Sequence, residues 1–155
     1  MTATPEDAEE FDTAEALQRA LRAEHAAVYA YGYIGARSQD EDRRLRCYEY
    51  LDAHRGQRDT LKGELRERDA VPAAGESSYA LPESDSGEAL ADYAVEVEDL
   101  TAQAYLELAA APDSALRELA LRSLQDATLR GMEWGADLPV FPGFPGGAPP
   151  APDGG

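Results

Sequence analysis

Five ionisable residues occupy positions on predicted helices from which they could bind a ligand or a metal ion: Glu24, His25, His54, Arg58 and Glu98. Glu24 falls on an apolar seam of leucine and tyrosine residues at four- and three-residue spacing, and His25 follows it directly. Burying a bare charge is costly, so a carboxylate in such a seam must be paired, protonated or bound to a metal. These residues therefore predict a buried polar network, a ligand anchor or a metal site.

The second predicted helix offers two partners for Glu24. His54 and Arg58 lie one turn apart on its apolar seam. An arginine can bind a carboxylate through two hydrogen bonds and stays charged when it is desolvated. We expect a buried interaction of Glu24 with Arg58 or with His54, and Glu98 or Glu96 as the acidic residue on the third helix. The histidine beside Glu24 is expected at the edge of the seam.

Hydrophobic periodicity predicts four helices, over residues 12–38, 40–69, 86–111 and 112–137. Asp12 and Glu15 indicate a capping box at the start of the first helix, and Pro112 suits the first turn of the fourth. The segment between the second and third helices is rich in Pro, Gly, Ser and acidic residues. It predicts a long loop that crosses the bundle, so the helices it joins need not be antiparallel neighbours.

These elements define one all-α domain with a tail at each end. Residues 1–11 are expected to form a disordered acidic tail, and residues 139–155 a Pro/Gly-rich tail. Residues 12–138 are expected to form a ferritin-like four-helix bundle with its long crossover loop between the second and third helices. Seam residues such as Leu100 and Cys47 are expected in the core.

Three segments of the sequence carry a resemblance: AEHAAVYAYG around Glu24, AHRGQRD around His54, and a closing Trp134 followed by a Phe-Pro-Gly sequence. Together they resemble an uncharacterised bacterial family of ferritin-like domains. The similarity extends over residues 13–143. It implies the four-helix fold, but it implies no activity because the role of that family is unassigned.

A di-iron site of the ferritin-like kind needs a glutamate from each of two helices and a Glu-x-x-His pair from each of the others. Glu24 and Glu98 fit the first two positions, but a leucine stands three residues before His54. Aligning the closing tryptophan with the usual aromatic places Thr128 and Gly131 where the last pair belongs. We therefore expect no di-iron centre and no cofactor. A single ion held by Glu24, His54 and Glu98 remains an alternative.

The charge of the chain restricts its partners. The net charge is −17 over 155 residues, which argues against nucleic acid and against an anionic membrane surface. The single Cys47 forms no intramolecular disulfide, and the acidic start of the chain resembles no signal peptide. We therefore expect a cytoplasmic protein.

Three functions are compatible with these residues. The favoured interpretation is a non-catalytic ferritin-like bundle with a charged, metal-free core that acts by association, most simply as a homodimer. Tyr33, Leu106 and Leu121 support it, because one bundle core need not bury them all. The alternatives are a binder of a small anionic ligand anchored by Arg58, and a degenerate metal-dependent oxidase.

Overall fold

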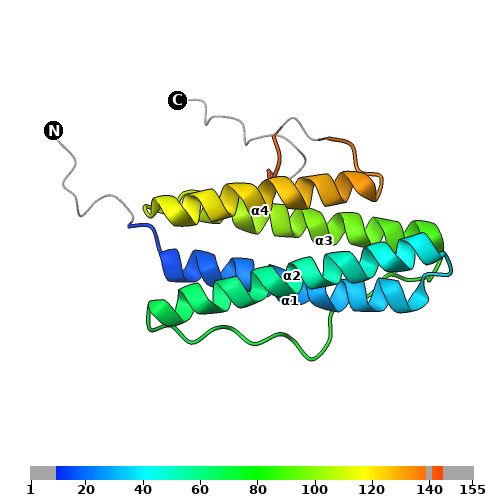
Figure 1. Ribbon diagram of the computed structural model, residues 1–155, viewed down its shortest axis with the longest axis horizontal. Coiled ribbons are helices and arrows are strands. Elements are labelled where there is room, and N and C mark those ends of the chain that lie inside the picture. The colour runs from blue at the N-terminus through cyan, green and yellow to red at the C-terminus, as the bar shows by residue number, and fades with distance from the viewer. Residues whose placement is uncertain (1–9, 139–140, 145–155) are drawn as a thin grey trace.

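The computed structural model describes residues 10–138 and 141–144, and within these residues it contains four α-helices and no strand (Figure 1). They are α1 (Thr13–Arg37), α2 (Glu41–Glu67), α3 (Gly87–Leu108) and α4 (Ser114–Glu133). The predicted all-α fold is confirmed. The expected tails at 1–11 and 139–155 lie almost entirely outside the described residues.

The connection between α2 and α3 runs along the length of the bundle (Figure 1). The pairs α1–α2 and α3–α4 are antiparallel hairpins, whereas α3 runs parallel to α2. Helix α1 packs on both α2 and α3, and α3 packs on α4. The structure is thus a four-helix bundle with one long crossover connection, as the sequence predicts.

Side-chain caps determine where the helices begin. The carboxylate of Asp12 accepts a hydrogen bond from the amide of Glu15, and Asp40 and Ser86 cap α2 and α3 in the same way. Asp113 caps α4 by accepting from the amides of its first turn. The fourth helix therefore begins after Pro112 rather than at it, because the capping residue itself lies outside the helix.

The last helix ends about one turn earlier than the hydrophobic pattern predicts. Gly135 has a φ of 103°, its amide bonds to the carbonyl of Met132, and the amide of Ala136 bonds to the carbonyl of Gly131. These two bonds close a Schellman motif, which requires a residue in the left-handed conformation. Glycine adopts that conformation without a steric penalty.

The apolar core forms two clusters along the bundle. One gathers around Leu17, Leu61 and Tyr105, and the other around Tyr31 and Trp134. Cys47 is buried in the second cluster as expected. Leu100, by contrast, is 51% exposed, so its prediction as a core residue is wrong. It follows Glu98 by two positions, which places it on the opposite side of α3. Among the described residues no helix combines the length and hydropathy of a membrane span.

The crossover loop is attached to the outer side of α1. Gln18 donates to the carbonyl of Val71 at 2.8 Å and accepts from the amide of Ala73 at 2.8 Å. Farther along, the hydroxyl of Tyr33 donates to Asp85 at 2.9 Å. One helix therefore supports the loop at both of its ends while its other face builds the core.

Candidate functional site

His54 lies between two buried glutamates in the middle of the bundle. Its Nδ1 is 2.5 Å from Oε2 of Glu24 on α1, and its Nε2 is 2.8 Å from Oε1 of Glu98 on α3. All three side chains are excluded from solvent. Each lies between the two apolar clusters along its own helix, so the bundle brings the three residues together only when α1, α2 and α3 are packed.

Three further side chains donate hydrogen bonds to the two carboxylates. Tyr105 donates to Oε1 of Glu24 at 2.6 Å. Tyr31 and Arg130 donate to Oε1 of Glu98 at 2.7 and 2.9 Å. We call this group the core ion network; its members are Glu24, Tyr31, His54, Glu98, Tyr105 and Arg130.

The contacts of His54 keep its ring protonated at neutral pH. Burial by itself lowers the pKa of this imidazole, but the hydrogen bonds to Glu24 and Glu98 and the charges of both carboxylates outweigh burial and raise the pKa to about 9. Both ring nitrogens then act as donors. With the guanidinium of Arg130 included, two positive charges balance two negative charges, and the network is neutral as a whole.

Glu98, Tyr31 and Tyr105 are also held in single protonation states. Burial opposes ionisation of Glu98, yet the hydrogen bond and charge of His54 and the charge of Arg130 lower the pKa of this carboxyl group. Burial raises the pKa of Tyr31 and of Tyr105, and the adjacent glutamates raise it further. The two tyrosines therefore stay neutral and act as hydrogen-bond donors.

The structure brings together three of the five residues that the sequence singled out: Glu24, His54 and Glu98. Between the two glutamates left open on the third helix, Glu98 is 1% exposed, whereas Glu96 is exposed to solvent. Of the two partners considered for Glu24, His54 makes the contact and Arg58 does not.

Arg58 does not belong to the core, which corrects the expectation of a Glu24–Arg58 pair. Its Nε lies 3.1 Å from Oδ1 of the neighbouring Asp59, and its side chain is 26% exposed. Four residues advance an α-helix by slightly more than one turn. On α2, which packs mainly on α1, this rotation carries Arg58 from the buried position of His54 toward the rim of the helix pair.

His25 also lies outside the network, at the half-buried edge expected for it. Its Nε2 lies 2.9 Å from the carbonyl oxygen of Ala73 in the crossover loop. Gly75 lies against the same ring, because a Cβ built on it would be 3.3 Å from Nδ1 of His25. This histidine therefore positions the loop rather than a ligand.

Arg130 is the member that sequence reasoning missed. It follows the buried Ala127 by three residues and precedes the buried Gly131, so its place beside the apolar face of α4 is visible in the sequence. A half-buried arginine at such a position indicates a carboxylate partner on the facing helix. Tyr31 and Tyr105 have the helical spacing of ordinary packing residues, and nothing local in the sequence indicates that their hydroxyls donate to Glu98 and Glu24.

The network does not fit a metal ion. Within the described residues no group of three or more His, Cys, Asp or Glu side chains could hold one. Both nitrogens of His54 are engaged by carboxylates, and the guanidinium of Arg130 already lies against Glu98. An added cation would meet an imidazolium and a guanidinium, which repel it.

Comparison with known proteins gives a family but no activity. The crystal structure of a conserved hypothetical protein, Rv2844 from Mycobacterium tuberculosis, is similar to this structure, with a TM-score of 0.74 and 27% sequence identity. The similarity covers 79% of this chain and 87% of that chain. No curated protein matches the sequence. Residues 16–147 match the family described as domain of unknown function DUF4439, and this chain belongs to that family.

Proposed function

We propose that this protein is a non-catalytic, ferritin-like helical bundle of a bacterial family and that it acts by association, as a homodimer. The observation that carries the proposal is the core ion network. Glutamates from α1 and α3 face each other across the bundle, as in a ferritin-like metal site, but protonated His54 and Arg130 supply the positive charge there. The mycobacterial origin of the similar structure supports the bacterial assignment.

The state of the network supports the absence of catalysis. A general base needs a free lone pair within reach of its substrate and a pKa near the working pH. His54 has both nitrogens hydrogen-bonded and no exposed surface. Burial also raises the pKa of the Cys47 thiol, which removes the reactive thiolate at neutral pH.

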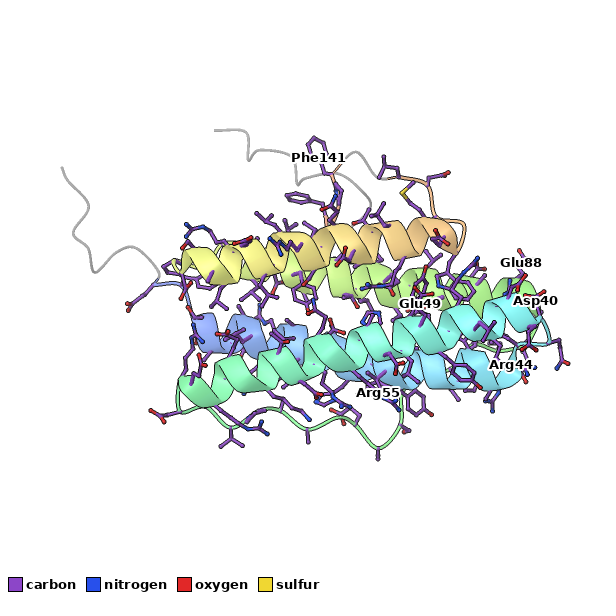
Figure 2. The ribbon with its side chains drawn as sticks, viewed as in Figure 1. Asp40, Arg44, Glu49, Arg55, Glu88 and Phe141 are labelled. Atoms are coloured by element: carbon purple, nitrogen blue, oxygen red, sulfur yellow. The ribbon has the colours of Figure 1, made fainter. Side chains whose placement is uncertain are left out.

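The outer face of α4 and the segment after it form the surface that we propose for association. Its large apolar side chains are exposed, and a groove of about 300 Å³ lies among several of them. We call it the α4 face; it comprises Leu121, Leu129, Met132, Leu138 and Phe141. Figure 2 shows Phe141 on the side of α4 that faces away from α1 and α2. Of the three side chains expected to be exposed, Leu121 is 54% exposed, whereas Tyr33 and Leu106 are half-buried.

Charge explains why a second copy can approach this face of a protein with a net charge of −17. The exposed charges of helix α4 are nearly balanced, because Arg117 and Arg122 stand against Glu118, Asp126 and Glu133 while Arg130 pairs with buried Glu98. Helix α3, by contrast, contains six acidic residues and no basic one. Two copies that meet through α4 therefore bring fewer like charges together than two copies that meet through α3 would.

Sedimentation and light scattering test the association. The expected mass is twice 16.7 kDa. The variants Leu121→Asp and Leu129→Asp, which place a charge on the α4 face, should yield a monomer. Leu45→Asp is the matched control, because Leu45 is 56% exposed on α2 and lies outside that face. A monomeric wild-type protein, or equal dissociation by the control, would refute the homodimer.

A second experiment tests the metal-free core. Addition of ferrous iron to protein purified without chelators should produce neither two bound ions per chain nor rapid iron oxidation. Two ions bound per chain in dilute protein would overturn this part of the proposal.

The cytoplasm is the compartment that we propose. The single Cys47 is buried as a free thiol, which suits a reducing environment. The net charge of −17 likewise favours protein partners over nucleic acid and over anionic membranes.

A further inference from the structure

The outer side of α4 carries a row of exposed residues at four-residue spacing. We call it the α4 ridge; it comprises Arg117, Leu121, Gln125, Leu129 and Glu133. Residues four apart form a continuous ridge on a helix surface, and ridges of this kind are the ones that most often pack between two helices. The α4 ridge shares its two leucines with the α4 face and adds a charged residue at each end.

The α4 ridge is complementary to itself when it is reversed. A leucine stands on either side of the central Gln125, and an arginine at one end stands against a glutamate at the other. A second copy that runs in the opposite direction therefore places leucine against leucine and arginine against glutamate along the whole ridge. Contacts of this kind are isologous, because residue i contacts residue j and residue j contacts residue i.

The charges at the two ends are available to a second copy. Nη1 of Arg117 donates to the carbonyl oxygens of Ala111 and Pro112 at 3.0 and 2.6 Å, and among the described residues this guanidinium pairs with no carboxylate. Oε2 of Glu133 lies 3.8 Å from Nε of Arg46, and both of these side chains are more than a third exposed. An exposed pair at this distance contributes little, so neither end charge has a strong partner within the chain.

The groove on the α4 face has room for the ridge of a second copy. Leu121, Gln125 and Leu129 line this groove of about 300 Å³, together with Leu138 and Pro142 from the segment after the helix. When two helices pack, the ridge of each lies in a groove of the other. The same three ridge residues can thus enter the groove of the second copy and line the groove that receives it.

We propose that two copies associate through α4 in antiparallel orientation, about a two-fold axis at Gln125. This inference rests on the proposed homodimer and specifies its geometry. Arg117 of each copy pairs with Glu133 of the other, and Leu121 of each packs on Leu129 of the other. At the axis the two copies of Gln125 meet, and the side-chain amide of each can donate to the side-chain carbonyl oxygen of the other.

Charge disfavours the parallel arrangement of the same two surfaces. Two parallel copies related by a two-fold axis would bring Arg117 beside Arg117 and Glu133 beside Glu133, and like charges across an interface are unfavourable. Antiparallel helices also place the positive N-terminal end of one dipole near the negative C-terminal end of the other. Both effects favour the reversed orientation.

Reversal of one end charge tests this pairing. Arg117→Glu would face Glu133 of the second copy, and Glu133→Arg would face its Arg117. Each variant should raise the dimer dissociation constant by about tenfold in sedimentation at about 0.1 M salt, because the symmetric dimer contains the altered pair twice. Arg55→Glu is the matched control for the first variant and should leave the constant unchanged, since Arg55 is 52% exposed on α2. Glu133→Arg lowers the net negative charge, so a general effect of charge would strengthen association instead.

The two reversals should compensate each other. The double variant Arg117→Glu/Glu133→Arg restores opposite charges at both ends of the ridge, and so does an equimolar mixture of the two single variants. Both samples should dimerise with nearly the wild-type dissociation constant. Loss of the bonds from Arg117 to Ala111 and Pro112 is a local effect that Glu133→Arg cannot repair, so compensation reports on the contact between copies.

A cysteine at the axis gives an independent measurement. Gln125→Cys should form a disulfide-linked dimer under mild oxidation, because a residue at the two-fold axis meets its own counterpart at the short distance that a disulfide needs. Leu45→Cys is the control and should stay unlinked, since Leu45 is exposed on α2. The native Cys47 is buried and should not interfere.

The outcomes separate this geometry from the homodimer itself. A wild-type dimer that neither reversal weakens, reversals that do not compensate, or a Gln125→Cys variant that stays unlinked would overturn the antiparallel pairing and leave the homodimer in place. A monomeric wild-type protein would refute the homodimer and this inference together.

Discussion

Replacing His54 by glutamine should remove one specific pH dependence of stability. In the folded protein the pKa of His54 is raised from 6.5 to about 9 by its contacts with Glu24 and Glu98. A raised folded pKa contributes stability that is fully present below about pH 6.5, where both states bind the proton. This stability is lost as the pH rises through about 9, where the folded state releases its proton.

The difference between 6.5 and about 9 corresponds to about 3 kcal/mol of unfolding free energy. Over this interval the wild-type protein should lose about 1.4 kcal/mol of stability per pH unit through this one group. His54→Gln should lack this slope. It should also be less stable by roughly 3–5 kcal/mol near pH 6, because two buried carboxylates lose a charged partner.

Urea denaturation followed by circular dichroism at pH 6, 7, 8 and 9 measures both quantities. The informative value is the difference in unfolding free energy between wild type and variant, since groups common to both cancel. That difference should shrink steadily with rising pH. His25→Gln is the matched control and should keep the wild-type slope, because His25 contacts the crossover loop and not the network. A difference that stays constant from pH 6 to 9 would refute a protonated His54.

Two further predictions compare residues that the sequence alone does not distinguish. Arg130→Ala should destabilise the fold by roughly 3–5 kcal/mol, because it leaves buried Glu98 without one of its cations. Arg58→Ala should cost about 1 kcal/mol or less. Equal losses of stability in urea denaturation would contradict the pairing of Arg130, rather than Arg58, with the core ion network. Gly35→Ala should cost about 1–3 kcal/mol because its Cβ would lie 3.2 Å from the Cβ of Cys47. Gly56→Ala, with nothing within 4 Å of its Cβ, should instead stabilise α2 by about 0.5–1 kcal/mol. If the melting temperatures of the Gly35 and Gly56 variants shift in the same direction, the close packing of Gly35 on Cys47 is contradicted.

Helical periodicity and capping residues, both visible in the sequence, account for the four helices and for the burial of Glu24 and His54. Apolar spacing predicts all four helices, and the positions of Asp12 and Ser86 beside helical runs are those of capping residues. The same spacing places Glu24 and His54 on buried faces, because helical periodicity determines which side a residue occupies. The missing ligands of a di-iron site are likewise a property of the sequence.

Tertiary packing decided which charged groups meet. Periodicity assigns a residue to a face but does not specify how far one helix is shifted along its neighbour or rotated toward it. That relation places Arg130 rather than Arg58 in the core, and Glu98 rather than Glu96. A cavity of about 420 Å³ beside Glu98 depends on the same relation between helices, because its walls come from α3, from α4 and from Ala136, Asp137 and Gly143 after α4. The neutral network is thus a product of four helices packed together, each contributing a group whose charge only the others can balance.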